Sequence, residues 1–390
     1  MIDKARTGGG WIFVPYAKLM IDLGNGLQEL PESMRDLIEV YDIQTEESGA
    51  TTLFFSIQDP NFVLLNSSIL TEDRTVYFEW GWANDWNNIA RYHDMHIALI
   101  EPTFGKEGYP ILDITCMDST HKMNREEKTR TFQNMKRSSI AKHIFQEYGM
   151  ECYVEDSGEL PVDVEEEIQQ SNETDISFLQ TLADEVVGTK FICYVENNKG
   201  YFCRRDYSQD PIIDMHYRDE VANDLSSFKC KINKEKVKYY KTSADINAET
   251  GIPFAGTCYS PTSNTRTQAD TVIVGNEREK TPEEIEQEQN ASKNTSAEKT
   301  AEDKFDNIQY EVCEGTVTPV VPIPTFPSRK CMNILGVGAA LSGKYYVKST
   351  QATIDSTGIT QSFEVRKSEF FGSVRNTDDS RDGRPSALVR

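Results

Sequence analysis

The 390-residue chain lacks the features that mark several large classes of protein. It has no run of about 18 apolar residues, so no segment is predicted to span a membrane. Its N-terminal segment has no uninterrupted apolar stretch and no small-residue cleavage site, so we expect no signal peptide. Basic residues are few, with 41 Lys and Arg against 63 Asp and Glu and a net charge of −22. This balance argues against a general nucleic-acid binder, which needs cationic side chains to release phosphate counterions.

The acidic excess itself has two interpretations. The first is solubility, because a net charge far from zero keeps proteins apart. The second is a surface that must not hold DNA that passes beside it. The sequence leaves both open.

Residues that usually build metal and catalytic centres are also scarce. There is no G-x-S-x-G motif for a serine nucleophile, no C-x-x-C pair, and no histidine spaced to complete a zinc site. We therefore predict no catalytic, cofactor-binding or metal-binding residue and no cofactor. A pair of glycosidase carboxylates stays open, since 63 acidic residues give no basis for choosing two. The five histidines are His93, His96, His121, His143 and His216, and we assign His93 and His96, which lie too near a strand start to form a helical metal pair, to polar surface.

Two patterns imitate binding sites. Residues Gly338–Lys344 satisfy G-x-x-x-x-G-K, but Tyr345 and a predicted strand follow where a phosphate-binding loop needs Ser or Thr and a helix. The acidic residues between 283 and 288 suggest a metal site, yet a solvated acidic face explains them better. We predict neither nucleotide nor metal binding there.

The eight cysteines are scattered, and we expect reduced, buried thiols for a chain that folds in cytoplasm. Cys193 and Cys203 are the exception, because a predicted hairpin places them roughly opposite each other. Whether they form a disulfide stays open.

Short strands with alternating side chains dominate the first 117 residues. Leu53, Phe55 and Ile57 share one face of a strand over 52–57, and a second strand over 76–82 carries Val, Phe, Trp and Trp on one face. Further strands are expected at 37–43, 96–100 and 111–117, and strands at this spacing favour an antiparallel barrel. The aromatic side chains of 76–82 must be buried somewhere, and contacts between chains would supply such a surface.

The next hundred residues change to a helical pattern. Ser138 or Ser139 can cap a helix that ends at Gly149, and a strand over 151–154 follows. Thr174 is predicted to cap a second helix, which Gly188 stops. The apolar face of this helix has six residues: Ile176, Phe178, Leu179, Leu182, Ala183 and Val186. A hairpin follows, with strands at 190–195 and 201–205 around a turn that contains Asn197, Asn198 and Gly200.

After residue 260 the composition becomes polar. Residues 276–304 have no aromatic side chain and one proline, which predicts a solvated linker or an isolated polar helix. Strands are expected at 228–232, 237–240 and 331–335, and a hairpin joins 346–353 to 359–367 through the turn Asp355–Gly358.

The order of residues is more specific than the elements themselves. Polar Gln169–Asp175, then Phe-Leu-x-x-Leu-Ala, a glycine and an aromatic hairpin resembles the late control gene D family. That family supplies the central baseplate hub of contractile phage tails and related injection machines. The strand, Asp-Pro turn and aromatic strand of 55–82 and the Gly-x-Tyr-Tyr-Val hairpin of 343–367 are similar to the family as well. The resemblance covers most of residues 30–260 and 305–367.

This resemblance implies a mainly β fold with an α+β insertion: two tube-protein-like antiparallel β-barrels plus a helix–hairpin α+β domain. Together with composition it divides the chain as follows: a first barrel with an N-terminal arm (1–117), an inserted α+β domain (118–218), a second barrel (219–260 and 306–372), an acidic polar linker or isolated helix (261–305) and a flexible tail (373–390).

The implied function is structural, without enzymatic activity. Three chains would form a pseudo-hexameric ring that joins the six-fold tail tube to the three-fold central spike and lines part of the DNA channel. The implied partners are a separate spike protein, tail tube or tube-initiator proteins, baseplate wedge proteins and, as a further candidate, the tape measure protein. The expected location is the virion tail baseplate, after assembly in the host cytoplasm. The alternatives are a tail-associated peptidoglycan hydrolase and an acidic assembly factor.

Overall fold

The computed structural model describes residues 14–106, 108–158, 167–186, 191–218, 223–232, 239–246, 253–259, 313–338 and 341–367. The predicted linker 261–305 and tail 373–390 lie outside these residues. Within them the chain is mainly antiparallel β with few helices, as the fold class predicted.

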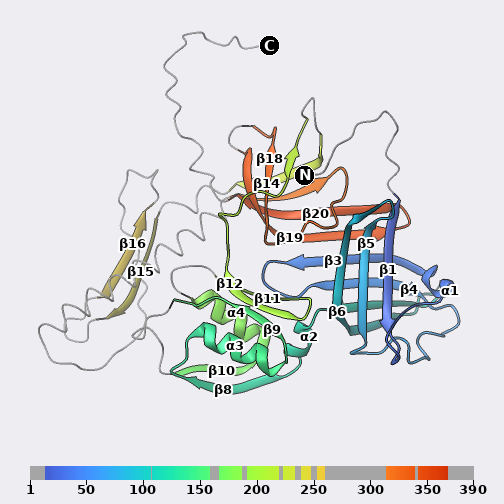
Figure 1. Cartoon of the computed structure of the whole chain (residues 1–390), viewed down its shortest axis with the longest axis horizontal. Helices are drawn as coiled ribbons and strands as arrows, with labels where there is room; N and C mark the ends of the chain where they lie inside the picture. Colours follow the sequence, from blue (N-terminus) through green and yellow to red (C-terminus); the bar gives the residue numbers. More distant parts are fainter. Residues whose placement is uncertain are drawn as a thin grey trace, which may run out of the picture.

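Thirteen strands form one large sheet (Figure 1). Eleven of them follow the order β14-β17-β20-β19-β3-β4-β7-β6-β5-β1-β2, while β18 pairs with β19 and β13 with β18. All neighbours are antiparallel except β13 and β18. The strands are β1 (Pro15–Asp22), β2 (Leu27–Glu29), β3 (Ile38–Glu46), β4 (Thr52–Gln58), β5 (Thr75–Trp82), β6 (Asp85–Thr103), β7 (Ile111–Met117), β13 (Asp214–His216), β14 (Leu225–Ile232), β17 (Cys313–Pro319), β18 (Cys331–Leu335), β19 (Gly343–Asp355) and β20 (Gly358–Lys367).

The N-terminal strands coil around an apolar core. Leu53, Phe55 and Ile57 of β4 are fully buried, as their alternation predicted. Tyr41 of β3 packs against Phe78 of β5 with ring centroids 5.2 Å apart, although β3 and β5 are not neighbours in the sheet. The sheet therefore curves until distant strands face each other across one core.

Strand β5 (Thr75–Trp82) corrects one expectation about assembly. Val76 and Phe78 are 0% exposed, Trp80 is 1% exposed and Trp82 is 6% exposed within this single chain. The chain's own core thus covers the aromatic face, and no neighbouring chain is needed to bury it. Any interface between copies must be formed by other residues.

A seam between β3 and β19 joins the N-terminal and C-terminal strands. Seven residue pairs, from Ser349↔Glu46 to Asp355↔Val40, connect residues about 300 positions apart along the chain. In Figure 1 the orange and red C-terminal strands accordingly lie beside the blue β3. Two separate β cores flank this seam, one built mainly on residues 19–116 and one on residues 215–365.

A third core belongs to an α+β unit, which lies between the two β cores in the sequence. Helices α3 (Arg137–Glu147) and α4 (Asp175–Glu185) pack on two small sheets, β8–β10 and β9–β12–β11 (Figure 1). All six residues of the predicted apolar face of α4 are buried.

The remaining elements are α1 (Glu32–Arg35), α2 (Thr120–Met123), β8 (Glu127–Gln133), β9 (Glu151–Val154), β10 (Glu167–Thr174), β11 (Phe191–Glu196), β12 (Lys199–Arg204), β15 (Tyr239–Ile246) and β16 (Pro253–Tyr259). Strands β15 and β16 form a sheet of their own.

The hairpin turn differs from the prediction at one glycine. Asn197 and Asn198 alone form a two-residue turn, each with positive φ, as tight hairpins require. Gly200 instead lies in β12, where an added Cβ would come within 2.3 Å of the Phe145 ring. Gly200 therefore serves the packing of α3 on the hairpin and not the turn.

Two predicted boundaries are also wrong. Helix α3 has Lys136 as its N-cap without a side-chain cap bond, so neither Ser138 nor Ser139 is the cap. The strand expected at 96–100 is part of the 19-residue β6, which runs from Asp85 to Thr103. Helix α4 ends at Glu185, and its predicted stop, Gly188, lies outside the described residues. By contrast, Gly149 follows α3 with φ +67, as a helix stop should.

No helix in the described part of the chain is long and apolar enough to cross a membrane.

Candidate functional site

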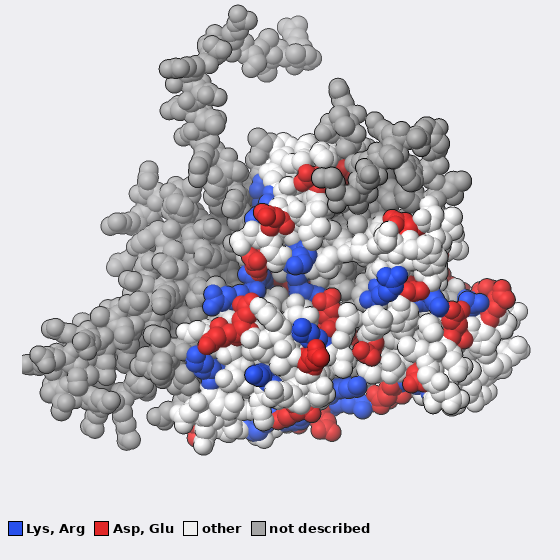
Figure 2. Space-filling model, viewed as in Figure 1, with Lys and Arg blue, Asp and Glu red and all other residues white. Residues whose placement is uncertain are grey.

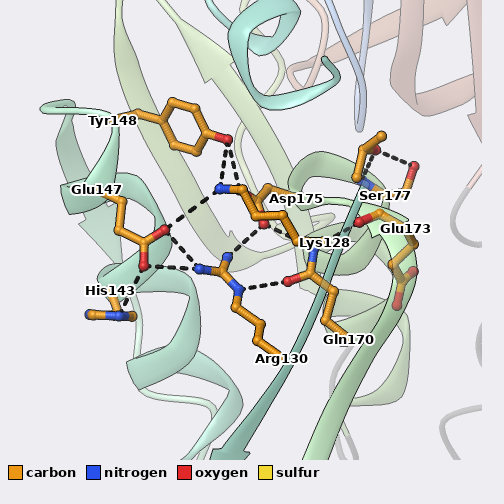
Figure 3. Close-up of polar contacts among 10 residues, drawn as sticks. Lys128, Arg130, His143, Glu147, Tyr148, Gln170, Glu173, Asp175 and Ser177 are labelled. Atoms are coloured by element: carbon orange, nitrogen blue, oxygen red, sulfur yellow. Dashed lines mark hydrogen bonds and ion pairs between the residues drawn. The ribbon is translucent and has the colours of Figure 1, made fainter. Parts of the chain in front are cut away.

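A polar centre lies inside the α+β unit, where the motif that resembles the hub family begins its helix (Figure 3). Asp175, the first residue of α4, has a side chain that is 0% exposed. Its Oδ2 accepts hydrogen bonds from Lys128 Nζ at 2.7 Å and Tyr148 Oη at 2.7 Å. Its Oδ1 accepts from Arg130 Nη2 at 2.6 Å and Gln170 Nε2 at 2.9 Å. One buried carboxylate thus connects β8, β10, α3 and α4.

The residues before Asp175 explain how β10 passes directly into α4. β10 contains an irregularity between Gln170 and Glu173, and Asn172 takes a positive φ of 52° there. The side chain of Gln170 donates to the backbone oxygen of Glu173, which holds the bulge. Thr174 then caps α4, as predicted, by accepting a hydrogen bond from the Ser177 backbone. The polar motif is therefore a device for turning a strand into a helix around a buried charge.

Burial, hydrogen bonds and neighbouring charges shift the pKa values of two side chains at this centre, Asp175 and Tyr148. Burial opposes ionisation of Asp175, but hydrogen bonds from Lys128, Tyr148 and Gln170, together with the charge of Arg130, outweigh it and hold its pKa below the ordinary value. Burial and the neighbouring Asp175 raise the pKa of Tyr148. Both groups therefore keep one protonation state near neutral pH, and the centre is suited to holding structure and not to moving protons.

A second polar cluster, which we call the three-way junction, contains Glu47, Arg205 and Arg366. Glu47 Oε1 lies 2.8 Å from Arg205 Nη2 and 3.2 Å from Arg366 Nη1. The side chains are only 8%, 5% and 12% exposed, and the three residues come from the end of β3, the segment after β12, and β20. Arg366 also reaches Glu314 of β17 at 2.9 Å. The junction thus ties both β cores to the chain that leaves the α+β unit.

Contacts beside the junction fix the hairpin of the α+β unit against the large sheet. Arg329 lies over the Tyr194 ring at 3.8 Å and comes within 3.7 Å of Glu196. Ser48 Oγ donates to the Cys193 backbone oxygen at 3.1 Å, and Asn197 accepts from the backbone of β6 at 3.3 Å. Partly exposed cation–π and charge pairs contribute little to the free energy of folding. Their main effect here is to fix the orientation of the hairpin against the large sheet.

The junction was not found from the sequence. Glu47, Arg205 and Arg366 belong to no motif in the sequence. Its members are separated by up to 319 positions, so no local signal could have brought them together.

The histidines do not gather into a site. His93 and His96 lie on β6, where His93 is exposed as predicted but His96 is buried at 6% exposure, so its assignment to the surface was wrong. His121 pairs with Asp73 at 3.2 Å, His143 with Glu147 at 3.1 Å, and His216 with Asp224 at 3.2 Å. Within the described residues, no group of three His, Cys, Asp or Glu side chains is placed to hold a metal ion. The acidic residues between 283 and 288 lie outside that part of the chain.

The phosphate-loop imitation leads into a strand. Residues 339 and 340 are not described, and Gly343 begins β19, so no helix follows the glycines. Cys193 and Cys203 are free thiols and are not opposite each other, because Cys193 pairs with Phe202 and Cys203 with Ile192. The two cysteines therefore point to opposite faces of the hairpin, which argues against a bridge between them.

Two surface properties bear on partners. Lysine, arginine and acidic side chains alternate over the face shown in Figure 2, without a single-sign patch. An exposed apolar patch lies where β4, β6 and β7 end. Phe62 stacks on Phe104 at 6.3 Å, and these side chains are 42% and 61% exposed.

Comparison with protein families gives one assignment. The model of the family described as the Alg8 N-terminal domain matches residues 58–356. The chain belongs to this family. No curated protein matches the sequence. The matched range contains the whole α+β unit and Arg205 of the three-way junction, whereas Glu47 and Arg366 lie outside it.

Comparison with solved structures identifies the fold. A tail protein from Neisseria meningitidis MC58 aligns with a TM-score of 0.60 at 13% identity, covering 91% of this chain and 97% of that one. The 43 kDa tail protein of prophage MuSo2 from Shewanella oneidensis gives 0.63 at 11% identity, with 91% and 99% coverage. An E. coli component of the type VI secretion system gives 0.55 at 9% identity, with 91% and 78% coverage. At these identities the likeness establishes a phage-tail-protein fold.

Proposed function

We propose that this chain is a structural baseplate hub of a contractile phage tail or a related injection machine, of the late control gene D type. The observation that carries the proposal is the near-complete overlap with two tail proteins, over 91% of this chain and at least 97% of theirs. The described fold has no large part that lacks a counterpart in these tail proteins. Since one fold can serve several functions, the role itself is our proposal.

The proposed assembly is a homotrimer. Each chain holds two β cores on one continuous sheet, so three chains supply six β units with three-fold symmetry. Such a ring could meet a six-fold tube on one side and a three-fold spike on the other. The proposed partners are therefore a separate spike protein, tube or tube-initiator proteins, and neighbouring wedge or tape measure proteins, in a virion tail assembled in the host cytoplasm.

Native mass spectrometry of the purified chain, alone and with the spike protein of the same tail, tests this assembly. We expect a species of three chain masses, either alone or in complex with the spike. A stable monomer at micromolar concentration in both samples would count against the hub.

The three cores also support a domain division, which we propose with the boundaries given above: barrels at 1–117 and at 219–260 with 306–372, and an insertion at 118–218. The segment 261–305 is proposed as a linker. Deletion of residues 276–298 should leave the melting temperature nearly unchanged, because closure entropy depends weakly on loop length. Unfolding of the second barrel in the deletion variant would show that the segment is part of that barrel.

DNA transit gives a further expectation for the ring. We propose that its inner surface is net negative, because exposed Lys and Arg would release counterions and hold the DNA. Repulsion would act over about 8 Å at physiological salt. Reversing acidic residues on the inner surface should slow DNA delivery at low salt, and unchanged delivery would contradict this part of the proposal.

We propose no catalytic activity. A groove of about 600 Å³ is lined by Asp36, Glu39 and Asp355 among others. Hydrogen bonds from Thr357 lower the pKa of Asp355, the opposite of what a glycosidase acid requires. Purified protein that clears cell-wall substrate would reverse this conclusion.

A further inference from the structure

Two cysteines that no motif singled out lie together on β14 and β17. Cys230 pairs in register with Gly315, and Cys313 pairs with Ile232, so the two cysteines are diagonal neighbours on one face of the antiparallel pair. Both are free thiols, and both belong to the C-terminal core, where Cys313 is fully buried and Cys230 partly buried. The Cys230 thiol is close enough to Cys313 to raise the pKa of Cys313.

Gly315 brings the two strands unusually close at this point. A Cβ at residue 315 would lie 2.8 Å from the Lys229 backbone oxygen and 3.1 Å from the Cys230 Cβ. A regular diagonal pair has Cα atoms about 7–8 Å apart, whereas a disulfide needs about 4.4–6.8 Å. Because residue 315 carries no side chain beside Cys230, the two strands can approach each other here, as a bond across the diagonal requires.

The two thiols differ in access. Burial, reinforced by the neighbouring Cys230, raises the pKa of Cys313 to about 11, so its thiolate is rare near neutral pH. Cys230 lies on the last paired strand of the large sheet and is partly exposed. An external reagent therefore meets Cys230 first, and Cys313 is positioned to resolve the product.

We propose that Cys230 and Cys313 form a disulfide when the folded chain meets a low-molecular-weight disulfide such as oxidised glutathione. The Cys230 thiolate attacks one sulfur of the reagent, which forms a mixed disulfide and releases one reduced glutathione. Cys313 then loses its proton to solvent and attacks the Cys230 sulfur, which forms the internal bond and releases the second glutathione. Two protein thiols are oxidised, and one glutathione disulfide is reduced to two thiols.

The proposed disulfide would connect the two ends of a long segment of the chain. The 82 residues between Cys230 and Cys313 leave and re-enter the large sheet next to this pair. A covalent link there closes that excursion at its base and fixes β14, an edge strand, to β17. The bond would be absent in a reducing cytoplasm and would form outside it.

The test is incubation of the native full-length chain with oxidised glutathione, followed by thiol counting in denaturant and intact-mass measurement. We expect the accessible thiols of the denatured chain to fall from eight to six, a mass loss of about 2 Da, and a linked peptide pair containing Cys230 and Cys313. Reduction with dithiothreitol should restore all eight thiols. The Cys193→Ser/Cys203→Ser chain is the matched control, and it should still lose two thiols.

Variants separate a specific pair from general thiol oxidation. Cys313→Ser should stop at one glutathione bound to Cys230, whereas Cys230→Ser should react slowly and gain no internal bond. Gly315→Ala should slow bond formation while keeping both thiols. A wild-type chain that retains eight thiols, that keeps glutathione on Cys230 without closing, or that links other cysteines would overturn the proposal.

Discussion

The polar centre around Asp175 gives the sharpest test of the structure. The change Asp175→Asn keeps the size of the side chain and removes the charge that Lys128 and Arg130 share. Removing one partner of a buried ion pair costs about 3–5 kcal/mol. The side chains of Lys128 and Arg130 are 29% and 23% exposed, so water can partly solvate them after the change. We therefore expect a loss near the lower end, about 3 kcal/mol.

The loss should be local to the α+β unit, because this unit has a core of its own. Hydrogen exchange of the α4 amides should accelerate by about 100-fold, which corresponds to about 3 kcal/mol. Exchange in β4 and β7, which belong to another core, should change little. The matched control is Asp355→Asn, where an exposed carboxylate bonds only within its own turn, so the exchange rates of the α4 amides should stay as in wild type.

Acid should reproduce the effect in the wild-type chain. The folded-state pKa of Asp175 lies below the value of an unfolded aspartate, so its stabilisation is present above about pH 4 and is lost as pH falls through the folded pKa. The stability difference between wild type and Asp175→Asn should therefore shrink between pH 7 and pH 3. A variant as stable as wild type at pH 7, or a difference that stays constant in acid, would refute the role assigned to this carboxylate.

Two more predictions concern packing and the three-way junction. Gly200→Ala places a methyl group against the Phe145 ring and should destabilise the unit by about 1–3 kcal/mol in urea unfolding, with partial recovery in a Phe145→Leu background. Glu47→Gln leaves Arg205 and Arg366 as nearly buried cations and should cost about 3–5 kcal/mol in thermal unfolding, whereas apolar replacement of all three should recover most of it. Equal stability of wild type and either single variant would contradict the packing described.

Local periodicity carried most of what could be predicted. The hairpin of β19 and β20 and the buried face of α4 follow from alternation and helical spacing, which act within a few residues. Thr174 was found as a cap because its hydrogen bond is also local. Gly200 was misread because glycine is common in turns, while its contact with α3 lies outside the hairpin.

The rest depends on partners far away in sequence. The β3–β19 seam joins two segments whose sequences are each typical of an ordinary strand. Neither sequence therefore contains a signal that identifies the other strand as its partner. The three charges of the junction are single residues in unrelated segments, and only the folded chain shows that Glu47 neutralises two arginines. Of the polar centre, the helix cap was predicted, but the partners of Asp175 on β8 were not.

The seam also has a consequence for synthesis. Thr45 on β3 bonds to Thr350 on β19, and 305 positions separate them. At a synthesis rate of about 5–20 residues per second, the β3 edge waits about 15–60 s before its partner leaves the ribosome. During that time the N-terminal strands present an open edge that can pair with another nascent chain. The pairing that joins the two halves of the sheet is thus among the last to become possible. Translation of one message by many ribosomes at once is therefore the condition under which this fold is most exposed to misassembly.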